Sequence, residues 1–128
     1  CSIAQRAGVK ALEVGNKCAI EMREQYLKRR NIVYNMLKDI NGLKTNLPKG
    51  AFYFFPDITH FLGLKTEKGD EIKSANDLSL YLLEDGKISL VPGEDFGAPN
   101  CIRLSYAASE KDLIEAVKRL STSLNKLT

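Results

Sequence analysis

Metal-binding side chains are scarce in this sequence. It holds a single histidine, His60, and three cysteines, Cys1, Cys18 and Cys101, with no CxxC or mixed Cys/His spacing. Structural zinc sites use four such ligands at characteristic spacings, so the sequence predicts no metal site and gives little support to a Cys–His catalytic pair. An odd number of scattered cysteines also favours reduced thiols over a disulfide framework.

Long apolar runs are missing as well. No stretch approaches the roughly 18 to 20 apolar residues that a membrane helix needs, and the N-terminus lacks the basic and apolar regions of a signal peptide. With 44% hydrophobic and 27% charged residues in 128, the composition is typical of one soluble globular domain. We therefore expect a cytoplasmic protein with no membrane partner.

Charge of one sign is not in large excess. Nineteen Lys and Arg residues against sixteen Asp and Glu give a net charge of +3. The basic cluster Lys28-Arg29-Arg30 lies in an amphipathic segment that also carries Glu21 and Glu24, and no exposed aromatic residues are expected between the basic ones. A solvated helix face explains this cluster better than a nucleic-acid site, so we predict no nucleic-acid partner.

Two helices are predicted in the first third of the chain. Ser2 and Gln5 match a capping box, which starts a helix that Gly15 ends. A second helix is predicted from Asn16 to Ile40 and is stopped by Asn41-Gly42. Its predicted core stripe has helical spacing and consists of Met22, Tyr26, Val33, Leu37 and Ile40.

The remaining pattern predicts a small sheet and two further helices. Ser74 and Ser109 are the expected N-caps of those helices. Four strand-like runs are Leu43–Leu47, Ala51–Phe55, Ile88–Val91 and Cys101–Ala107. This order of elements indicates an α+β fold in which helices cover one face of a small sheet.

Arg103 is the candidate functional residue because it lies in the middle of the last predicted strand. Side chains alternate along a strand, so Ile102, Leu104 and Tyr106 should face the core while Cys101, Arg103 and Ser105 face the opposite side. A guanidinium on a rigid strand can hold a carboxylate through two parallel hydrogen bonds. From spacing alone, an exposed strand residue or a structural ion pair to Glu94 or Asp95 explains Arg103 better than a ligand site does.

Several motifs resemble a known enzyme family. They are Val91-Pro92-Gly93, Phe96-Gly97, Ile102-Arg103-Leu104-Ser105-Tyr106-Ala107 and Ser109-Glu110, with Gly50–Pro56 and Arg29-Arg30 upstream in matching order. Together they are similar to the C-terminal part of aspartate-type aminotransferases, the fold-type I enzymes that use pyridoxal phosphate. The similarity spans nearly the whole chain.

This resemblance implies a function and a role for two residues. Such enzymes move an amino group between an amino acid and a 2-oxo acid through pyridoxal phosphate, and the arginine of the motif, here Arg103, binds the substrate α-carboxylate. The resemblance also places one side of Phe52 near the substrate. We expect residues 1–15 to form a helix from the domain junction and residues 16–128 to form the small C-terminal domain of a homodimeric enzyme.

The family's catalytic residues have no counterpart in this sequence. Its Schiff-base lysine, the aspartate that pairs with the pyridine nitrogen and the phosphate-binding residues lie upstream of the similar region, and no glycine-rich loop opens a helix here. We therefore predict no catalytic, cofactor-binding or metal-binding residue in this chain. We also expect that the chain alone is inactive and self-associates through the small apolar face of its first helix.

Two other classes of function stay open at this stage. A small α+β domain can be a stand-alone carboxylate-binding or regulatory module, because such domains often serve as ligand sensors. The basic cluster leaves nucleic-acid binding as a third and less favoured alternative.

Overall fold

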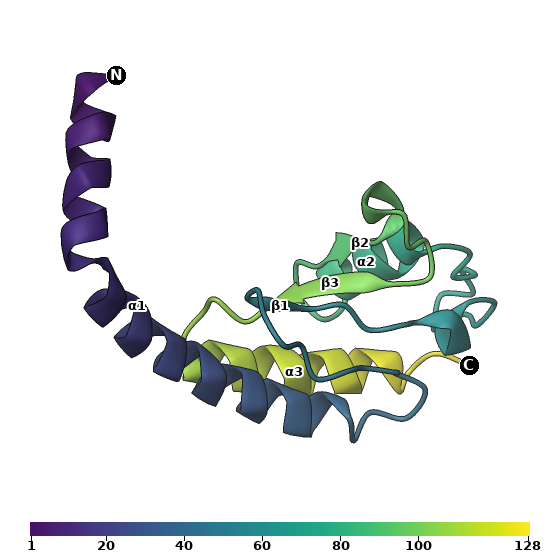
Figure 1. The fold of residues 1–128 in the computed structure, drawn as a ribbon. Coiled ribbons are helices and arrows are strands. Elements are labelled where there is room, and N and C mark those ends of the chain that lie inside the picture. The colour runs from purple at the N-terminus through teal and green to yellow at the C-terminus, as the bar shows by residue number, and fades with distance from the viewer.

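The computed structural model describes all 128 residues, and its helices and strands are interspersed along the chain. In chain order they are α1 (Ser2–Leu37), β1 (Tyr53–Phe54), the 3-10 helix η1 (Thr59–Phe61), α2 (Ala75–Glu84), β2 (Val91–Pro92), the 3-10 helix η2 (Glu94–Phe96), β3 (Ile102–Ser105) and α3 (Glu110–Leu124). This arrangement confirms the predicted α+β fold (Figure 1).

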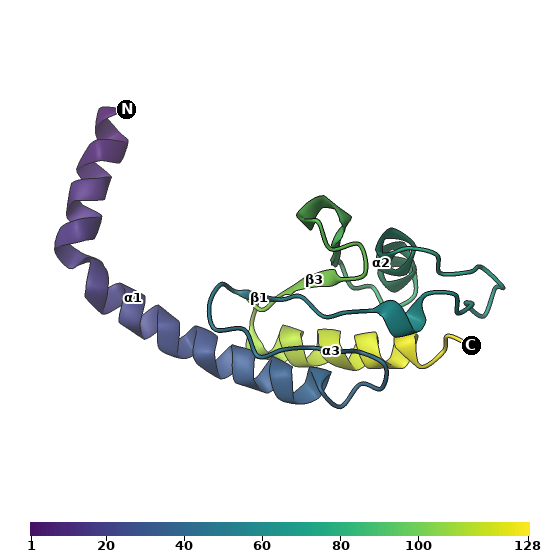
Figure 2. The ribbon, with the colours of Figure 1, turned by 45° about the vertical axis from the view of Figure 1, so that its right-hand side comes forward.

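The three strands form one antiparallel sheet in the order β1-β3-β2. Phe54, Ile102 and Leu104 are buried on one face, and α3 and the C-terminal half of α1 run side by side beneath that face (Figures 1 and 2). The Tyr34 ring of α1 stacks on Phe54, with 6.5 Å between ring centroids. The prediction that helices cover one face of the sheet is therefore confirmed.

The strands are shorter than the sequence predicts. Of the predicted strand Ile88–Val91, only Val91 belongs to β2, because the Ile88 N–H bonds to the Leu82 carbonyl at 3.2 Å and closes the end of α2 instead. Ala51 has a φ of 61°, which is not an extended conformation, so β1 starts only at Tyr53. The predicted edge strand Leu43–Leu47 is reduced to an isolated bridge between Lys44 and Asp57.

The prediction of two N-terminal helices is wrong, because α1 is continuous over 36 residues. Gly15 does not adopt the left-handed conformation that ends many helices. A glycine inside a helix costs only about 1 kcal/mol relative to alanine, and no proline interrupts the run. The predicted capping box is also wrong, since the N-cap is Cys1 and no side chain caps the helix.

The N-terminal half of α1 projects from the body of the molecule (Figures 1 and 2). Residues 1–25 are exposed except for the partly buried Gly15, and Leu12 is 89% exposed. Met22 is 58% exposed, so it does not belong to the core stripe, whereas Val33, Leu37 and Ile40 are buried as predicted. Packing of residues 1–15 at a domain junction, or self-association through them, stays a prediction.

Side-chain caps start the two later helices, as predicted. The Ser74 hydroxyl accepts a hydrogen bond from the Asp77 N–H at 3.1 Å, and Ser109 does the same for Asp112 at 3.1 Å. Both helices then contribute apolar residues to a core of 20 side chains that also includes the buried face of the sheet. None of the helices is both long and apolar enough to cross a membrane.

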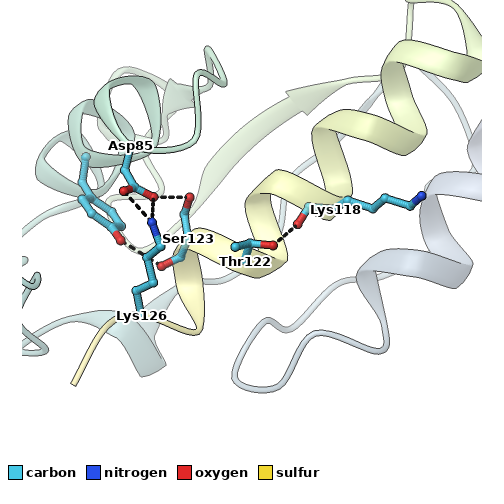
Figure 3. A network of polar contacts seen from close by, with 6 residues as sticks. Asp85, Lys118, Thr122, Ser123 and Lys126 are labelled. Carbon is cyan, nitrogen blue, oxygen red and sulfur yellow. Dashed lines mark hydrogen bonds and ion pairs between the residues drawn. The ribbon is translucent and has the colours of Figure 1, made fainter.

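A polar network joins the C-terminal ends of α2 and α3 (Figure 3). The Asp85 carboxylate accepts hydrogen bonds from Ser123 Oγ at 2.7 Å and from Lys126 Nζ at 2.8 Å, while the Tyr81 hydroxyl donates to the Ser123 carbonyl at 2.9 Å. Ser123 itself is 2% exposed. The hydrogen bonds from Lys126 and then from Ser123 lower the pKa of Asp85 below its ordinary value.

We expect Asp85→Ala to reduce the free energy of unfolding by about 1–3 kcal/mol, because it leaves the buried Ser123 hydroxyl without its acceptor. Since the folded pKa of Asp85 is depressed, the contribution of its charge is present above the ordinary aspartate pKa of about 4 and is lost as pH falls through the folded pKa. Urea unfolding from neutral to acid pH should therefore show a narrowing difference between wild type and variant. Glu84→Ala, at an exposed neighbouring position, is the matched control, and an equal loss in both variants would contradict the role of the network.

Candidate functional site

Arg103 lies on the central strand β3 and on the face of the sheet that the helices leave uncovered. Its neighbours Ile102 and Leu104 are 0% and 4% exposed, whereas Arg103 is only partly buried. In the register of the sheet, Val91 is paired with Arg103, and Tyr53 is paired with Ser105, which lies on the same face as Arg103. The predicted orientation of Arg103 is confirmed.

Aromatic rings surround the guanidinium of Arg103. Its Cζ lies 4.8 Å from the ring centroid of Phe96 and 5.5 Å from that of Tyr53, both within the range of a cation–π interaction. The Phe55 ring meets Phe96 edge to face at 6.1 Å between centroids. These rings come from β1, from the residue after it and from η2, so two separate segments meet at Arg103.

No carboxylate of the chain pairs with Arg103. The five ion pairs in the structure involve other residues, and the Glu94 carboxylate instead accepts a hydrogen bond from the Asn76 N–H at 3.3 Å. The alternative in which Arg103 pairs with Glu94 or Asp95 is therefore wrong. The guanidinium makes no side-chain hydrogen bond within the chain, so its five N–H donors remain available for a ligand.

The loop from Gly93 to Cys101 holds Phe96 beside Arg103. Gly93 N–H donates to the Cys101 carbonyl at 2.8 Å, and the Gly93 carbonyl accepts from Phe96 N–H and Ala98 N–H, both at 3.0 Å. A Cβ atom on Gly93 would collide with the backbone carbonyl oxygens of Ala98 and Cys101. The absence of a side chain at Gly93 is therefore what lets the loop close so tightly.

Phe52, the second predicted site residue, lies at the edge of this aromatic group. It is 53% exposed, and its ring meets Tyr53 edge to face at 6.0 Å between centroids. Phe52 contacts the Tyr53 ring, and Tyr53 in turn contacts Arg103, so Phe52 is connected to Arg103 only through Tyr53. A role for Phe52 at the substrate stays a prediction.

Sequence reasoning missed the rings that contact Arg103. Tyr53 could have been found by pairing the run Ala51–Phe55 with β3, since residues two apart on one strand share a face. Phe96 belongs to the Phe96-Gly97 motif, but its contact with Arg103 arises from the closure of the loop, which no periodicity reveals.

The basic cluster Lys28-Arg29-Arg30 contacts other parts of the chain. Lys28 forms an ion pair with Glu110 at 2.8 Å, and Arg30 donates to the Pro48 carbonyl at 3.0 Å. The Arg29 guanidinium lies 5.6 Å from the ring centroid of Tyr26. These contacts give the cluster a structural role in holding α1 to α3 and to the segment before β1.

Cys101 and Asp57, which pair with each other through an isolated β-bridge, do not resemble an acid–base pair. Burial, and then the negative charge of Asp57, raises the pKa of the Cys101 thiol, which keeps it protonated. Hydrogen bonds from Thr59 lower the pKa of Asp57 below its ordinary value. Neither group is therefore tuned toward neutral pH, where a general acid or base would operate.

Comparison with known proteins gives the family. The family model described as aminotransferase class I and II matches residues 1–120. The aspartate aminotransferase of Rhizobium meliloti (strain 1021) is 40% identical over 127 residues, which cover 99% of this chain and 31% of that protein. The aspartate aminotransferase of Pinus pinaster is 38% identical over 126 residues, covering 96% of this chain and 26% of that protein.

Solved structures agree with the sequence comparison. The crystal structure of the aspartate aminotransferase from Rhizobium meliloti superposes with a TM-score of 0.92 at 40% identity, covering 99% of this chain and 32% of that one. The aspartate aminotransferase from Thermotoga maritima gives a TM-score of 0.79 at 36% identity, covering 96% and 28%. The chain belongs to the class I and II aminotransferases, and it spans about a third of the length of these relatives.

This membership bears on the alternative functions. The relatives named above are aminotransferases, so nothing in the comparisons supports a stand-alone carboxylate-binding or regulatory module. The predicted resemblance to the aspartate-type family is confirmed.

We expect Gly93→Ala to destabilise the chain by about 1–3 kcal/mol, because the loop must open to accommodate the added methyl group. Gly50→Ala is the matched control, since no atom lies within 4 Å of the Cβ that it would add. Urea unfolding of the two variants tests the difference. Equal stability of the two variants would show that the loop does not depend on the close approach at Gly93.

Proposed function

We propose that the whole protein is a pyridoxal-phosphate-dependent aminotransferase of the aspartate type, and that Arg103 holds the α-carboxylate of its substrates. Family membership supports the reaction class. The observation that carries the assignment of Arg103 is its unpaired guanidinium, which lies on a central strand between two aromatic rings. The substrates are an amino acid, aspartate-like by relationship, and a 2-oxo acid.

The chemical contribution of Arg103 is binding and orientation. The planar guanidinium presents N–H donors in a fork that matches the two oxygens of a carboxylate, and the contact is charge-assisted. Two parallel hydrogen bonds fix both the position and the rotation of the substrate around its carboxylate. Such positioning contributes to catalysis because the reacting bond of the substrate is then held in one geometry.

The residues of this chain do not fit the phosphate group of the cofactor. Ser74 caps the first turn of α2, where the Asn76 N–H also donates a hydrogen bond to the Glu94 carboxylate. The first turn of α3 contains the carboxylates of Glu110 and Asp112. Carboxylates at these helix ends disfavour a phosphate, and the N-terminus of α1 lies at the far end of the projecting helix (Figure 1). Pyridoxal phosphate supplies the electron sink for transamination when it is bound.

The proposal therefore assigns cofactor binding to a large domain of the same protein outside this chain. We further propose that the intact protein is a homodimer that works in the cytoplasm, as the resemblance to the aspartate-type enzymes implies. In this arrangement the chain contributes substrate binding and the large domain contributes the reacting groups.

In the intact protein, Arg103→Ala should lower kcat/KM by about 100-fold, because it removes a bidentate, charge-assisted contact worth a few kcal/mol. Arg103→Lys should also lose most activity, since an ammonium keeps the charge but not the planar fork. Steady-state kinetics with amino-acid and 2-oxo-acid substrates test both variants. Arg119→Ala, which breaks an exposed ion pair with Glu115, is the control, and activity of Arg103→Ala within about threefold of wild type would contradict the assignment.

The 128-residue chain alone should fold through its core of 20 residues but should neither transaminate nor bind pyridoxal phosphate specifically. Visible absorbance after mixing with the cofactor, followed by borohydride trapping and mass spectrometry, measures any Schiff base. The intact protein is the positive control. Stoichiometric labelling of one lysine in the chain alone would show that the cofactor site lies within it.

A further inference from the structure

We propose that Phe96 is a positioning residue that holds the guanidinium of Arg103 ready for a carboxylate. The inference rests on the proposed function, because it concerns how Arg103 meets its substrate. Phe96, on η2, would then promote substrate binding by orienting Arg103 and not by touching the substrate itself.

The aromatic rings beside Arg103 restrict the motion of its guanidinium without accepting hydrogen bonds from it. Phe96 is the nearer of the two rings, at 4.8 Å from Cζ against 5.5 Å for Tyr53. The face of an aromatic ring attracts a cation, but the Phe96 ring offers no hydrogen-bond acceptor. Phe96 can therefore lower the rotational freedom of the long arginine side chain while all of its N–H donors stay available.

The position of Phe96 is itself fixed. The loop that carries it is closed by the backbone hydrogen bond between Gly93 and Cys101 and by the left-handed conformation of Gly97, with a φ of 72°. Phe55 contacts the Phe96 ring edge to face, with 6.1 Å between the ring centroids. Phe96 is 51% exposed, so its contribution to the hydrophobic core is small and its placement needs another explanation.

The same loop keeps a competing carboxylate away from Arg103. Glu94 lies two residues before Phe96 and would neutralise the guanidinium if it turned toward it. Its carboxylate instead bonds to the Asn76 N–H in the first turn of α2, where the helix dipole favours a negative charge. The loop thus places the Phe96 ring against the guanidinium of Arg103 and holds the Glu94 carboxylate at α2. The guanidinium therefore forms no ion pair with Glu94.

Pre-orientation of this kind should affect substrate binding more than the chemical step. An arginine that is already ordered loses less side-chain entropy when the carboxylate binds. In the intact protein, Phe96→Leu should raise KM about fivefold for amino-acid and 2-oxo-acid substrates, the effect of losing one cation–π contact, and Phe96→Tyr should restore the wild-type value. The kcat value should change by less than about twofold.

Two comparisons separate positioning from a general structural effect. Leu80→Ala on α2 removes an apolar side chain that is as exposed as Phe96 and is not among the rings against Arg103, and it should leave KM unchanged. In an Arg103→Ala background, Phe96→Leu should have no further effect, because its effect acts through Arg103. Additive losses in this double-mutant cycle would overturn the proposal.

A direct measurement tests the orientation of Arg103 without relying on activity. The ¹⁵N relaxation of the Arg103 Nε–H group in the intact protein without substrate, assigned by its disappearance in Arg103→Lys, should show an ordered side chain. Phe96→Leu should lower the order parameter and Phe96→Tyr should not. An unchanged order parameter in Phe96→Leu overturns the role of Phe96, whatever the kinetics show.

The two measurements also separate this inference from the proposed function. A loss of order in Phe96→Leu together with full activity of Arg103→Ala would count against carboxylate binding by Arg103 but would support its orientation by Phe96. The opposite result, a large loss in Arg103→Ala with no loss of order in Phe96→Leu, would support the proposed function and reject the role of Phe96.

Discussion

Burial of Ile102, Leu104 and Tyr106 against the helices determines the direction in which Arg103 points. These three side chains are between 0% and 4% exposed, and the Tyr106 hydroxyl also donates to the Ala51 carbonyl at 2.8 Å. A shift of β3 by one residue would exchange its two faces and bury the guanidinium in the core at a large free-energy cost. Packing of the hydrophobic face of β3 therefore determines which side chains lie on its opposite, polar face. The position of Arg103 follows from this core packing.

The uncovered face of the sheet then provides an environment that suits a cation and lacks an anion. Tyr53 and Phe96 lie against the guanidinium, and Glu94 of η2 accepts a hydrogen bond from the Asn76 N–H of α2. The partly buried Arg103 guanidinium makes no hydrogen bond or ion pair within the chain, which is compatible with its proposed contact to a substrate carboxylate. This combination brings a short loop, a helix N-terminus and a strand together around Arg103.

The sequence predicted the parts of this arrangement that depend on local periodicity. Alternation along β3 gave the orientation of Arg103, and Ser74 and Ser109 gave the starts of α2 and α3. The continuity of α1 was missed because Gly15-Asn16 reads as a stop signal, although neither residue takes the left-handed conformation of a stop. The Phe96 contact and the true lengths of the strands depend on loop closure and on hydrogen bonds between distant segments, which no local pattern encodes.

The continuity of α1 has a mechanical consequence. The helix has 36 residues, so its contour is about 54 Å long, and it bends between its N-terminal part and the part that packs on α3 (Figures 1 and 2). Its last turns carry Val33 and Leu37, which are 0% exposed and belong to the same core as Ile102 and Leu104. The buried half of α1 is therefore fastened to the sheet, so any reorientation of that half would carry β3 and Arg103 with it.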